Sequence, residues 1–319
     1  MDLNGCKILV TGASGLVGGS LVPRLLQTGA QVRATFRNRT ITDFDGQVET
    51  MAADLTDIHA CQRAVEGMDI VIHCAAGSGG AASMTERPMA YVTSNIVMDS
   101  LLLDASYRAG IKKFLWLGST TGYPPSGERL IREEEMFDGE PFEKYYFVGW
   151  AKRCTEILCR MYGEKLPKKM LTIVLRPTSI YGPGEDFDPA TSHVIPALIR
   201  KVVERRDPLE VWGTGNDVRD VIYVDDVVDV ILRALTSIDE SVAINIGHGQ
   251  ACSVQEILNL LLELDCFPDA NITFNASRPT TIPIRKVDLS RAANLLNFQA
   301  KVSLREGLAK TLAWYRQNR

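Results

Sequence analysis

Short runs of apolar residues alternate with longer amphipathic segments through the first half of the chain. The apolar runs are continuous and rich in Val and Ile, as expected of strands that are covered on both faces of a sheet. We predict strands at residues 7–11, 31–35, 70–74, 113–117 and 172–176. We predict helices at residues 16–27, 89–109 and 145–162. This alternation indicates an α/β fold in which helices cover both faces of a doubly wound parallel sheet.

The pattern changes after Pro177. Gly and Pro interrupt the chain up to about residue 191, and shorter elements follow. We predict strands near residues 221–223 and 243–246, and helices at residues 191–205, 225–237, 253–264 and 304–317. The change predicts a first domain of residues 1–176 and a smaller mixed α/β domain of residues 177–319, with residues of about 210–240 returning to the first.

The composition changes this picture little. Of the 319 residues 45% are hydrophobic and 23% are charged, as in a globular protein. The net charge of -4 argues against a nucleic-acid partner, because such proteins are usually basic. Seven cysteines without a CxxC spacing favour reduced thiols and a cytoplasmic protein. We expect no signal peptide, no membrane span and no metal ligands.

The first predicted strand leads directly into a glycine-rich turn, Gly12-Ala-Ser-Gly15-Leu-Val-Gly18, and a helix follows. In this context the backbone N–H groups and the helix dipole can hold a pyrophosphate, as in Rossmann-type folds. A turn with only a structural role is the alternative. We predict that a dinucleotide contacts Gly12, Ser14, Gly15, Leu16, Val17 and Gly18.

The end of the second predicted strand indicates which dinucleotide binds. An acidic residue there would bind the ribose 2′-hydroxyl of NAD, but this chain has Arg37 and Arg39. Two arginines suit a 2′-phosphate, so we favour NADP and keep NAD possible. Solvated loop charges are the alternative for the two arginines. We expect Asp54 and Leu55, after the third strand position, beside the adenine.

Further segments, together with the glycine turn, resemble the extended short-chain dehydrogenase/reductase family of NAD-dependent epimerases and dehydratases. They are IVIHCAA, LGSTTGYP, RPTSIYGPG, GTGNDVRDVIYVDD, Asn95 and Lys152. The resemblance covers nearly the whole chain and is closest to GDP-L-fucose synthases, in residues 192–201 and 211–215. It implies a nucleotide-sugar substrate between the two domains and further cofactor contacts at Cys74, Ala75, Ala76, Asn95, Lys152, Arg176 and Pro177.

The resemblance also implies the catalytic group, and here the chain departs from the family. The family uses a Tyr-xxx-Lys pair on one helix with a Ser or Thr nearby, and Ser119 and Lys152 match. Val148 stands where the tyrosine is expected, and valine transfers no proton. Tyr145, about two turns before Lys152 at about 3.6 residues per turn, could replace it. Alternatively, Ser119 or Thr121 with Lys152 or a water carries the proton, or the protein binds its ligands without turnover.

A second departure concerns epimerisation. In GDP-L-fucose synthases a Cys and a His form the acid/base pair, and here His193 matches the His but Thr121 stands at the Cys position. A core or capping role is the alternative for His193. We therefore expect a 4-keto reduction or a single-centre epimerisation. Dehydration is not expected, because the family's Asp-Glu pair is absent at residues 120–121.

The resemblance further implies substrate contacts. Trp212 would stack on the base and Arg219 would hold the diphosphate, whereas burial of Trp212 and pairing of Arg219 with Asp220 or Asp225 are the alternatives. Other candidates are Thr178, Ser179, His193, Lys201 and Arg278. We expect a homodimer through residues 91–105 and 145–162, with Met98, Leu102, Ile157 and Met161 as apolar positions.

These residues together favour an NAD(P)-dependent nucleotide-sugar epimerase/reductase that exchanges hydride at a sugar carbon, C4 of a GDP- or other NDP-hexose. The alternative, supported by the missing tyrosine, is a catalytically impaired protein that binds NADP and a nucleotide sugar as a sensor or scaffold.

Overall fold

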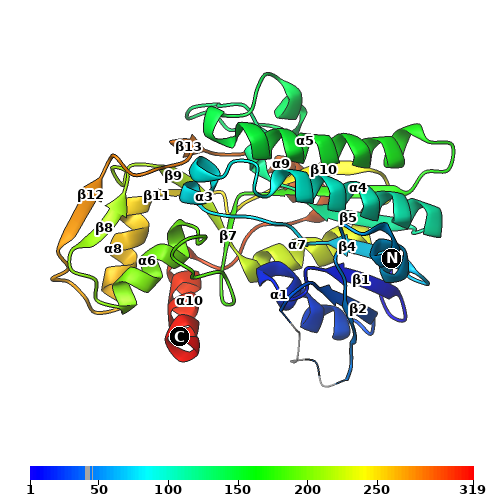
Figure 1. Cartoon of the computed structure of the whole chain (residues 1–319), viewed down its shortest axis with the longest axis horizontal. Helices are drawn as coiled ribbons and strands as arrows, with labels where there is room; N and C mark the ends of the chain where they lie inside the picture. Colours follow the sequence, from blue (N-terminus) through cyan, green and yellow to red (C-terminus); the bar gives the residue numbers. More distant parts are fainter. Residues whose placement is uncertain (40–43, 45) are drawn as a thin grey trace.

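A seven-stranded parallel sheet forms the centre of the fold in the computed structural model, which describes residues 1–39, 44 and 46–319. Its strand order is β10-β6-β5-β4-β1-β2-β3 (Figure 1). The strands are β1 (Lys7–Thr11), β2 (Gln31–Phe36), β3 (Glu49–Ala52), β4 (Ile70–His73), β5 (Lys113–Leu117), β6 (Leu171–Pro177) and β10 (Val242–Ile246). The predicted doubly wound parallel sheet is confirmed.

Helices cover both faces of this sheet because successive side chains of a strand point to opposite faces. In β1, Ile8 and Val10 belong to the core shared with α1 (Leu16–Leu26) and α7 (Val224–Ser237). Leu9 points the other way, into a second core beneath α2, α4 and α5. These helices span Ile58–Val65, Val92–Ala109 and Tyr146–Arg160, and α4 and α5 lie side by side in Figure 1.

Two predicted helices have different limits. The helix expected at residues 89–109 begins at Val92, and a separate short helix, α3 (Ala81–Glu86), precedes it. Pro88 restricts the backbone of Arg87, which leaves the helical region and ends α3. The helix expected at residues 145–162 is α5, which begins one residue later and passes at Met161 into the π-helical turn η4 (Met161–Lys165).

Two smaller sheets lie beyond the carboxyl end of the large one. In the first, β9 (Val218–Tyr223) pairs with β7 (Ser179–Tyr181), β11 (Ala251–Ser253) and β13 (Ile284–Arg285). In the second, β8 (Leu209–Trp212) pairs with β12 (Ile272–Asn275). The helices that follow or separate these strands are α6 (Val194–Val203), α8 (Val254–Leu264), α9 (Ser290–Leu296) and α10 (Leu304–Asn318).

The chain returns to the large sheet after β9. The returning elements are α7, which lies within the expected residues 210–240, and β10, which follows them, whereas β8 and β9 stay in the smaller sheets. Val242 to Ile246 of β10 pair in parallel with Ile173 to Pro177 of β6. No helix of the described residues is long and apolar enough to cross a membrane.

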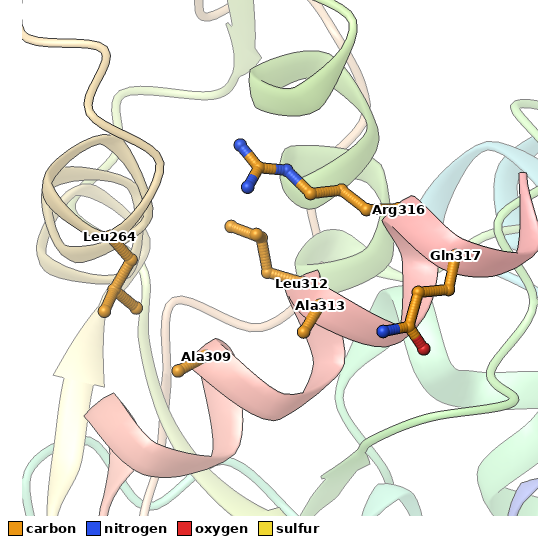
Figure 2. A pocket seen from close by; sticks show the side chains of 6 residues that line it. All are labelled: Leu264, Ala309, Leu312, Ala313, Arg316 and Gln317. Carbon is orange, nitrogen blue, oxygen red and sulfur yellow. The ribbon is translucent and has the colours of Figure 1, made fainter.

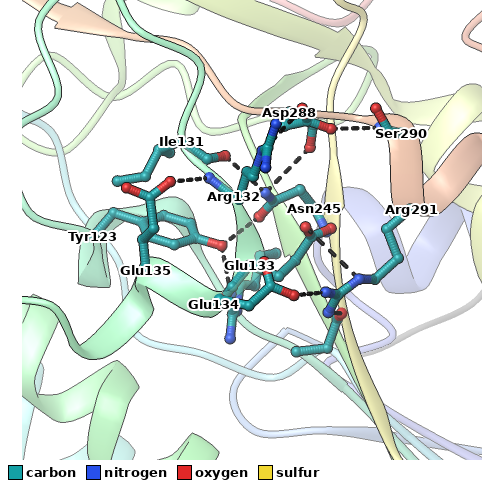
Figure 3. A network of polar contacts seen from close by, with 12 residues as sticks. Tyr123, Ile131, Arg132, Glu133, Glu134, Glu135, Asn245, Asp288, Ser290 and Arg291 are labelled. Carbon is teal, nitrogen blue, oxygen red and sulfur yellow. Dashed lines mark hydrogen bonds and ion pairs between the residues drawn. The ribbon is translucent and has the colours of Figure 1, made fainter.

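A buried network of hydrogen bonds centred on Asn245 connects β10 to neighbouring segments (Figure 3). The Tyr123 hydroxyl donates to Asn245 Oδ1 at 2.6 Å, and the Asn245 amide N–H donates to Glu133 at 2.9 Å. Asn245 Nδ2 donates to the carbonyls of Ile131 and Asp288, each at 3.2 Å. The loop after β5, the 3₁₀ turn η2 (Glu133–Phe137) and the segment before α9 are thereby joined through one asparagine.

Candidate functional site

A cavity of about 1050 Å³ lies where the carboxyl ends of the parallel strands face the smaller sheets. Ligands of open α/β sheets bind at this edge. The predicted residues that line it are Ser14, Gly15, Leu16, Val17, Arg39, Cys74, Ala76, Ser119, Thr121, Tyr145, Lys152, Pro177, Thr178, Ser179, His193, Lys201, Trp212 and Arg219. A smaller hollow of about 390 Å³ between α8 and α10 contains no predicted site residue (Figure 2).

The glycine turn has the geometry that an anion site needs. Gly12 has a φ of +68°, and a Cβ on Gly18 would lie 2.4 Å from the Gly12 carbonyl oxygen. Gly15 is the N-cap of α1, and no side chain caps the first N–H groups of that helix. Uncapped N–H groups at a helix N-terminus suit a phosphate, so the turn fits a dinucleotide.

Several of the other expected cofactor residues make hydrogen bonds within the protein or are buried, and do not line the cavity. Asn95 holds the neighbouring loop, because it donates to the Gly77 carbonyl at 2.9 Å and accepts from the Gly77 N–H at 2.8 Å. Asp54 accepts from the Thr56 N–H and hydroxyl, and Leu55 is buried. Those that do not line the cavity are Gly12, Gly18, Arg37, Asp54, Leu55, Ala75, Asn95 and Arg176.

Arg176 is committed to partners inside the protein. Its guanidinium forms a buried ion pair with Glu156 and donates to the Glu133 carbonyl at 2.8 Å and to the Tyr123 hydroxyl. Arg176 is only 2% exposed. The structure therefore places Arg176 beneath the cavity, where its side chain supports α5 and η2.

Ser119 and Thr121 form a small hydrogen-bonded unit at the end of β5. Ser119 caps the 3₁₀ turn η1 (Thr120–Gly122), and its Oγ accepts from the Thr121 N–H at 3.1 Å and from the Thr121 hydroxyl at 3.0 Å. Both side chains line the cavity. Because Ser119 Oγ accepts twice from Thr121, its own proton is available for another acceptor.

Lys152 lies on α5 with its Nζ 4.9 Å from the centre of the Trp116 ring. Burial lowers the pKa of this ammonium, and the charge of Asp99 opposes that shift. Asp99 is buried on α4, accepts from the Thr155 hydroxyl at 2.6 Å, and lies 2.9 Å from His73 Nε2. Asp99 is a functional candidate that the sequence analysis missed.

His193 occupies the N-cap position of α6, but its side chain makes no capping hydrogen bond. The imidazole lines the cavity. Desolvation by the cavity walls lowers the pKa of this imidazole, and the charge of Asp186 acts in the opposite direction. A lowered pKa favours the neutral ring at neutral pH, which can accept a proton.

Two cations lie close to the Trp212 ring. Lys201 Nζ is 5.9 Å and the Arg278 guanidinium 5.3 Å from its ring. The indole N–H donates to Glu210 at 3.2 Å, and the same carboxylate pairs with Arg278 at 3.6 Å. Trp212 is half-buried in the cavity wall, whereas Arg278 does not line the cavity.

Arg219 is buried in the same wall and is held mainly by protein groups. It donates to the carbonyls of Val218 and Pro283, to the Thr281 hydroxyl at 2.6 Å, and to Asp217 at 3.3 Å. The pairing of Arg219 with Asp220 or Asp225, the alternative to a diphosphate contact, does not occur, because Arg219 pairs with Asp217. Asp220 instead accepts from the N–H groups of residues 248 and 249.

Comparison with known proteins agrees with this geometry. The family described as "NAD dependent epimerase/dehydratase family" matches residues 8–247. The chain belongs to the NAD-dependent epimerase/dehydratase family. It is 31% identical to a GDP-L-fucose synthase of Sinorhizobium fredii, over 97% of this chain and 95% of the relative. It is 30% identical to a dTDP-4-dehydro-6-deoxy-D-allose reductase of a Streptomyces species, over 98% of this chain and 97% of the relative.

A solved structure supports the same assignment. MoeE5 in complex with UDP-glucuronic acid and NAD superimposes with a TM-score of 0.85 at 28% identity, covering 98% of this chain and all of that one. The relatives are thus enzymes of nucleotide sugars, and the predicted membership of this epimerase/dehydratase family is confirmed.

Within this family the missing tyrosine remains the main departure. Val148 lines the cavity from α5, and so does Tyr145. Tyr145 is the N-cap of α5 and lies outside its first turn. Tyr145 and Lys152 are therefore not separated by the two regular helical turns that the sequence predicted. No hydrogen-bond partner of the Tyr145 hydroxyl occurs among the described residues.

Several acidic or basic side chains of the cavity wall were also missed, among them Glu185, Glu210 and Arg285. Burial raises the pKa of Glu185 well above its usual range, and one of its oxygens has no hydrogen-bond partner in the part of the chain that the structure describes. The sequence carries only a weak signal for these residues, because Glu185 and Glu210 lie beside a motif and not in it, and no motif lies near Arg285.

Proposed function

We propose that this chain is an NAD(P)-dependent nucleotide-sugar epimerase/reductase that exchanges hydride at C4 of a GDP- or other NDP-hexose. One observation carries the proposal: a single cavity is lined by the glycine turn, by Ser119, Tyr145 and Lys152, and by Trp212. A site that only stored a dinucleotide would not need Ser119, Tyr145 or Trp212. Family membership supports the same class of reaction.

The N-terminus of α1 would hold the pyrophosphate, and Lys152 would hold the nicotinamide ribose. Arg39 is exposed and lines the cavity, so NADP is the cofactor that we favour over NAD. A bound nicotinamide would supply the hydride acceptor or donor. Residues of this chain then have to position the sugar and move one proton at its reacting oxygen.

Ser119 would hold the reacting oxygen, since Thr121 occupies its acceptor positions and leaves its proton free to donate. Tyr145 would exchange the proton with that oxygen, because its phenol lines the same cavity without a protein partner among the described residues. Proton transfer through Ser119 and Thr121 alone is the alternative.

The acid/base chemistry beyond C4 rests on His193. A neutral imidazole in the cavity could remove a proton beside a keto group, but Thr121 is a much weaker acid than the cysteine of GDP-L-fucose synthases. The residues therefore support reduction or epimerisation at one centre, and not epimerisation at two.

A second candidate follows from Val148. A family member without the usual tyrosine could bind NADP and a nucleotide sugar without turnover, as a sensor or scaffold. The polar groups around the expected reaction centre favour the enzyme, because a sensor needs neither Ser119 nor Tyr145 to move a proton.

The decisive experiment measures absorbance of the reduced nicotinamide after addition of GDP-, UDP-, CDP- and dTDP-sugars, including 4-keto forms. The proposal predicts a redox change or a new sugar with at least one of them. Binding without either outcome would identify the sensor. Arg219→Ala should weaken binding of the sugar nucleotide and keep cofactor binding, and Arg108→Ala, an exposed change on α4, serves as the control.

We also propose a cytoplasmic homodimer. All seven cysteines are described and unpaired, which suits a reducing compartment. Ile157 and Met161 are exposed on and after α5, but Leu102 is fully buried in the core and cannot contribute to the interface. Light scattering that gives the mass of a single chain would contradict the dimer.

A further inference from the structure

Arg285 is a buried cation in the cavity wall that has no acidic partner. It is 5% exposed and lies on β13. Its two terminal nitrogens donate to the carbonyls of Tyr123, at 3.1 Å, and Pro124, at 3.0 Å. Its Nε is buried without a hydrogen-bond partner, and no carboxylate lies within ion-pair distance of it among the described residues.

The surroundings of Arg285 disfavour its charged form. Burial lowers its pKa to about 10, which still leaves the group protonated at neutral pH, and Arg219 acts in the same direction. The register of β13 with β9 places Arg285 opposite Arg219. Asp217 pairs with Arg219 only. A buried charge without a counter-ion is strongly unfavourable, so an anion in the cavity would relieve it.

The position of Arg285 indicates which part of a substrate it meets. The carbonyls that hold it directly follow η1, the turn that carries Ser119 and Thr121. Tyr145 and Arg285 both line the cavity. Arg285 therefore belongs with the proposed reaction centre, whereas Lys201 and Arg278 surround Trp212.

We propose that Arg285 binds an anionic oxygen group of the nucleotide sugar, a carboxylate on the sugar ring or the diphosphate. The inference rests on the proposed function and narrows its substrate class. The carbonyls that hold Arg285 directly follow the turn capped by Ser119, which favours the carboxylate, so the preferred substrate is an NDP-hexuronic acid. A guanidinium binds a carboxylate through charge-assisted hydrogen bonds, and Arg285 lines the cavity without a carboxylate partner among the described residues.

Calorimetry with two ligand series tests this inference: UDP, UDP-glucose and UDP-glucuronic acid, and GDP, GDP-mannose and GDP-mannuronic acid. Arg285→Gln removes the charge and keeps an amide that can donate to the two carbonyls. We expect its affinity for the hexuronate of the series that the wild type binds to fall at least about tenfold. Arg129→Gln is the control, because that arginine is exposed and pairs with Glu135.

The pattern of losses distinguishes the two anions. A loss confined to the hexuronates identifies a sugar carboxylate, and a loss that extends to UDP or GDP identifies the diphosphate. Unchanged affinity for every ligand would overturn the inference and leave the proposed function standing. A wild-type protein that binds none of the six would overturn both.

Folding of the variants is checked by cofactor affinity and thermal unfolding. If Arg285→Gln does not fold, Arg285→Lys replaces it. That variant keeps the charge but loses the planar set of donors, and we expect a smaller loss of hexuronate affinity in the same direction. Equal affinity of Arg285→Lys and the wild type for all ligands would then count against the inference.

Discussion

Ser119 Oγ accepts two hydrogen bonds from Thr121, one from its backbone N–H and one from its hydroxyl. The serine is thereby fixed as a donor toward the cavity. We expect Ser119→Ala to lower kcat about 100-fold, since it removes the group that holds the reacting oxygen. Thr121→Val keeps the shape and the N–H bond, and should cost only about 1 kcal/mol of transition-state stabilisation, or about fivefold. Steady-state kinetics measure kcat of both variants, with the substrate that the absorbance screen identifies. Equal losses would show that the hydroxyl of Thr121 itself carries the proton.

Restoring the family's tyrosine should increase the rate. Val148 lines the cavity four residues before Lys152, so Val148→Tyr would place a phenol on the same face of α5 as the lysine. We expect kcat to rise at least about tenfold, with Val148→Phe as the control for size. Tyr145→Phe in the wild-type chain should lower kcat by a similar factor. A Tyr145→Phe variant with unaltered turnover would remove Tyr145 from the mechanism.

The pH dependence of cofactor binding should reveal the environment of Lys152. Burial lowers the pKa of Lys152 below its usual 10.5. The side chain is therefore fully protonated at low pH and loses its charge as the pH rises through the lowered pKa. We expect cofactor affinity to fall as the pH rises through the same range. Asp99 opposes the shift, so Asp99→Asn should lower the pKa further and move the loss to lower pH. Fluorescence titration of the reduced cofactor gives the profile.

The matched control for that profile lies on the same helix. Asp104 pairs with the exposed Arg108, and Asp104→Asn removes a carboxylate without approaching the cavity. Its profile should coincide with that of the wild type. A profile for Asp99→Asn that also coincides would show that this carboxylate does not act on Lys152.

The buried pair of Arg176 and Glu156 predicts an effect on stability. Glu156→Gln leaves the guanidinium buried without its carboxylate, and removal of one partner of such a pair costs about 3–5 kcal/mol. Urea unfolding measures the free energy. Glu263→Gln is the comparison, because it breaks an exposed pair with Arg305 and should change stability by less than about 1 kcal/mol. Similar effects of the two changes would contradict the role assigned to the buried pair.

Local patterns predicted most strands of the large sheet but missed β3 and most of the short strands of the smaller sheets. Residues 7–11 and 113–117 are strands with the predicted limits, because short continuous apolar runs between turn signals are typical of a covered strand. Arg176 shows the limit of such reasoning. Its motif suggested a cofactor contact, but Glu156 lies 20 residues earlier on α5, and only the packing of α5 against β6 brings the two together.

Arg285 illustrates the same limit from the other side. β13 contains only two residues, and no apolar run marks it. Its place in the cavity wall depends on the register with β9 and on the two carbonyls near Pro124. Pairings of this kind over long distances in the sequence leave no periodicity to read.

The position of β10 has a consequence for synthesis of the protein. This strand completes the edge of the large sheet beside β6, yet β7, β8 and β9 precede it in the chain. A growing chain therefore cannot finish the sheet that carries the glycine turn until much of the opposite wall of the cavity has also emerged. Until then the β6 edge has unpaired backbone groups, which invite wrong pairing. The two walls of the cavity thus have to complete their folding together.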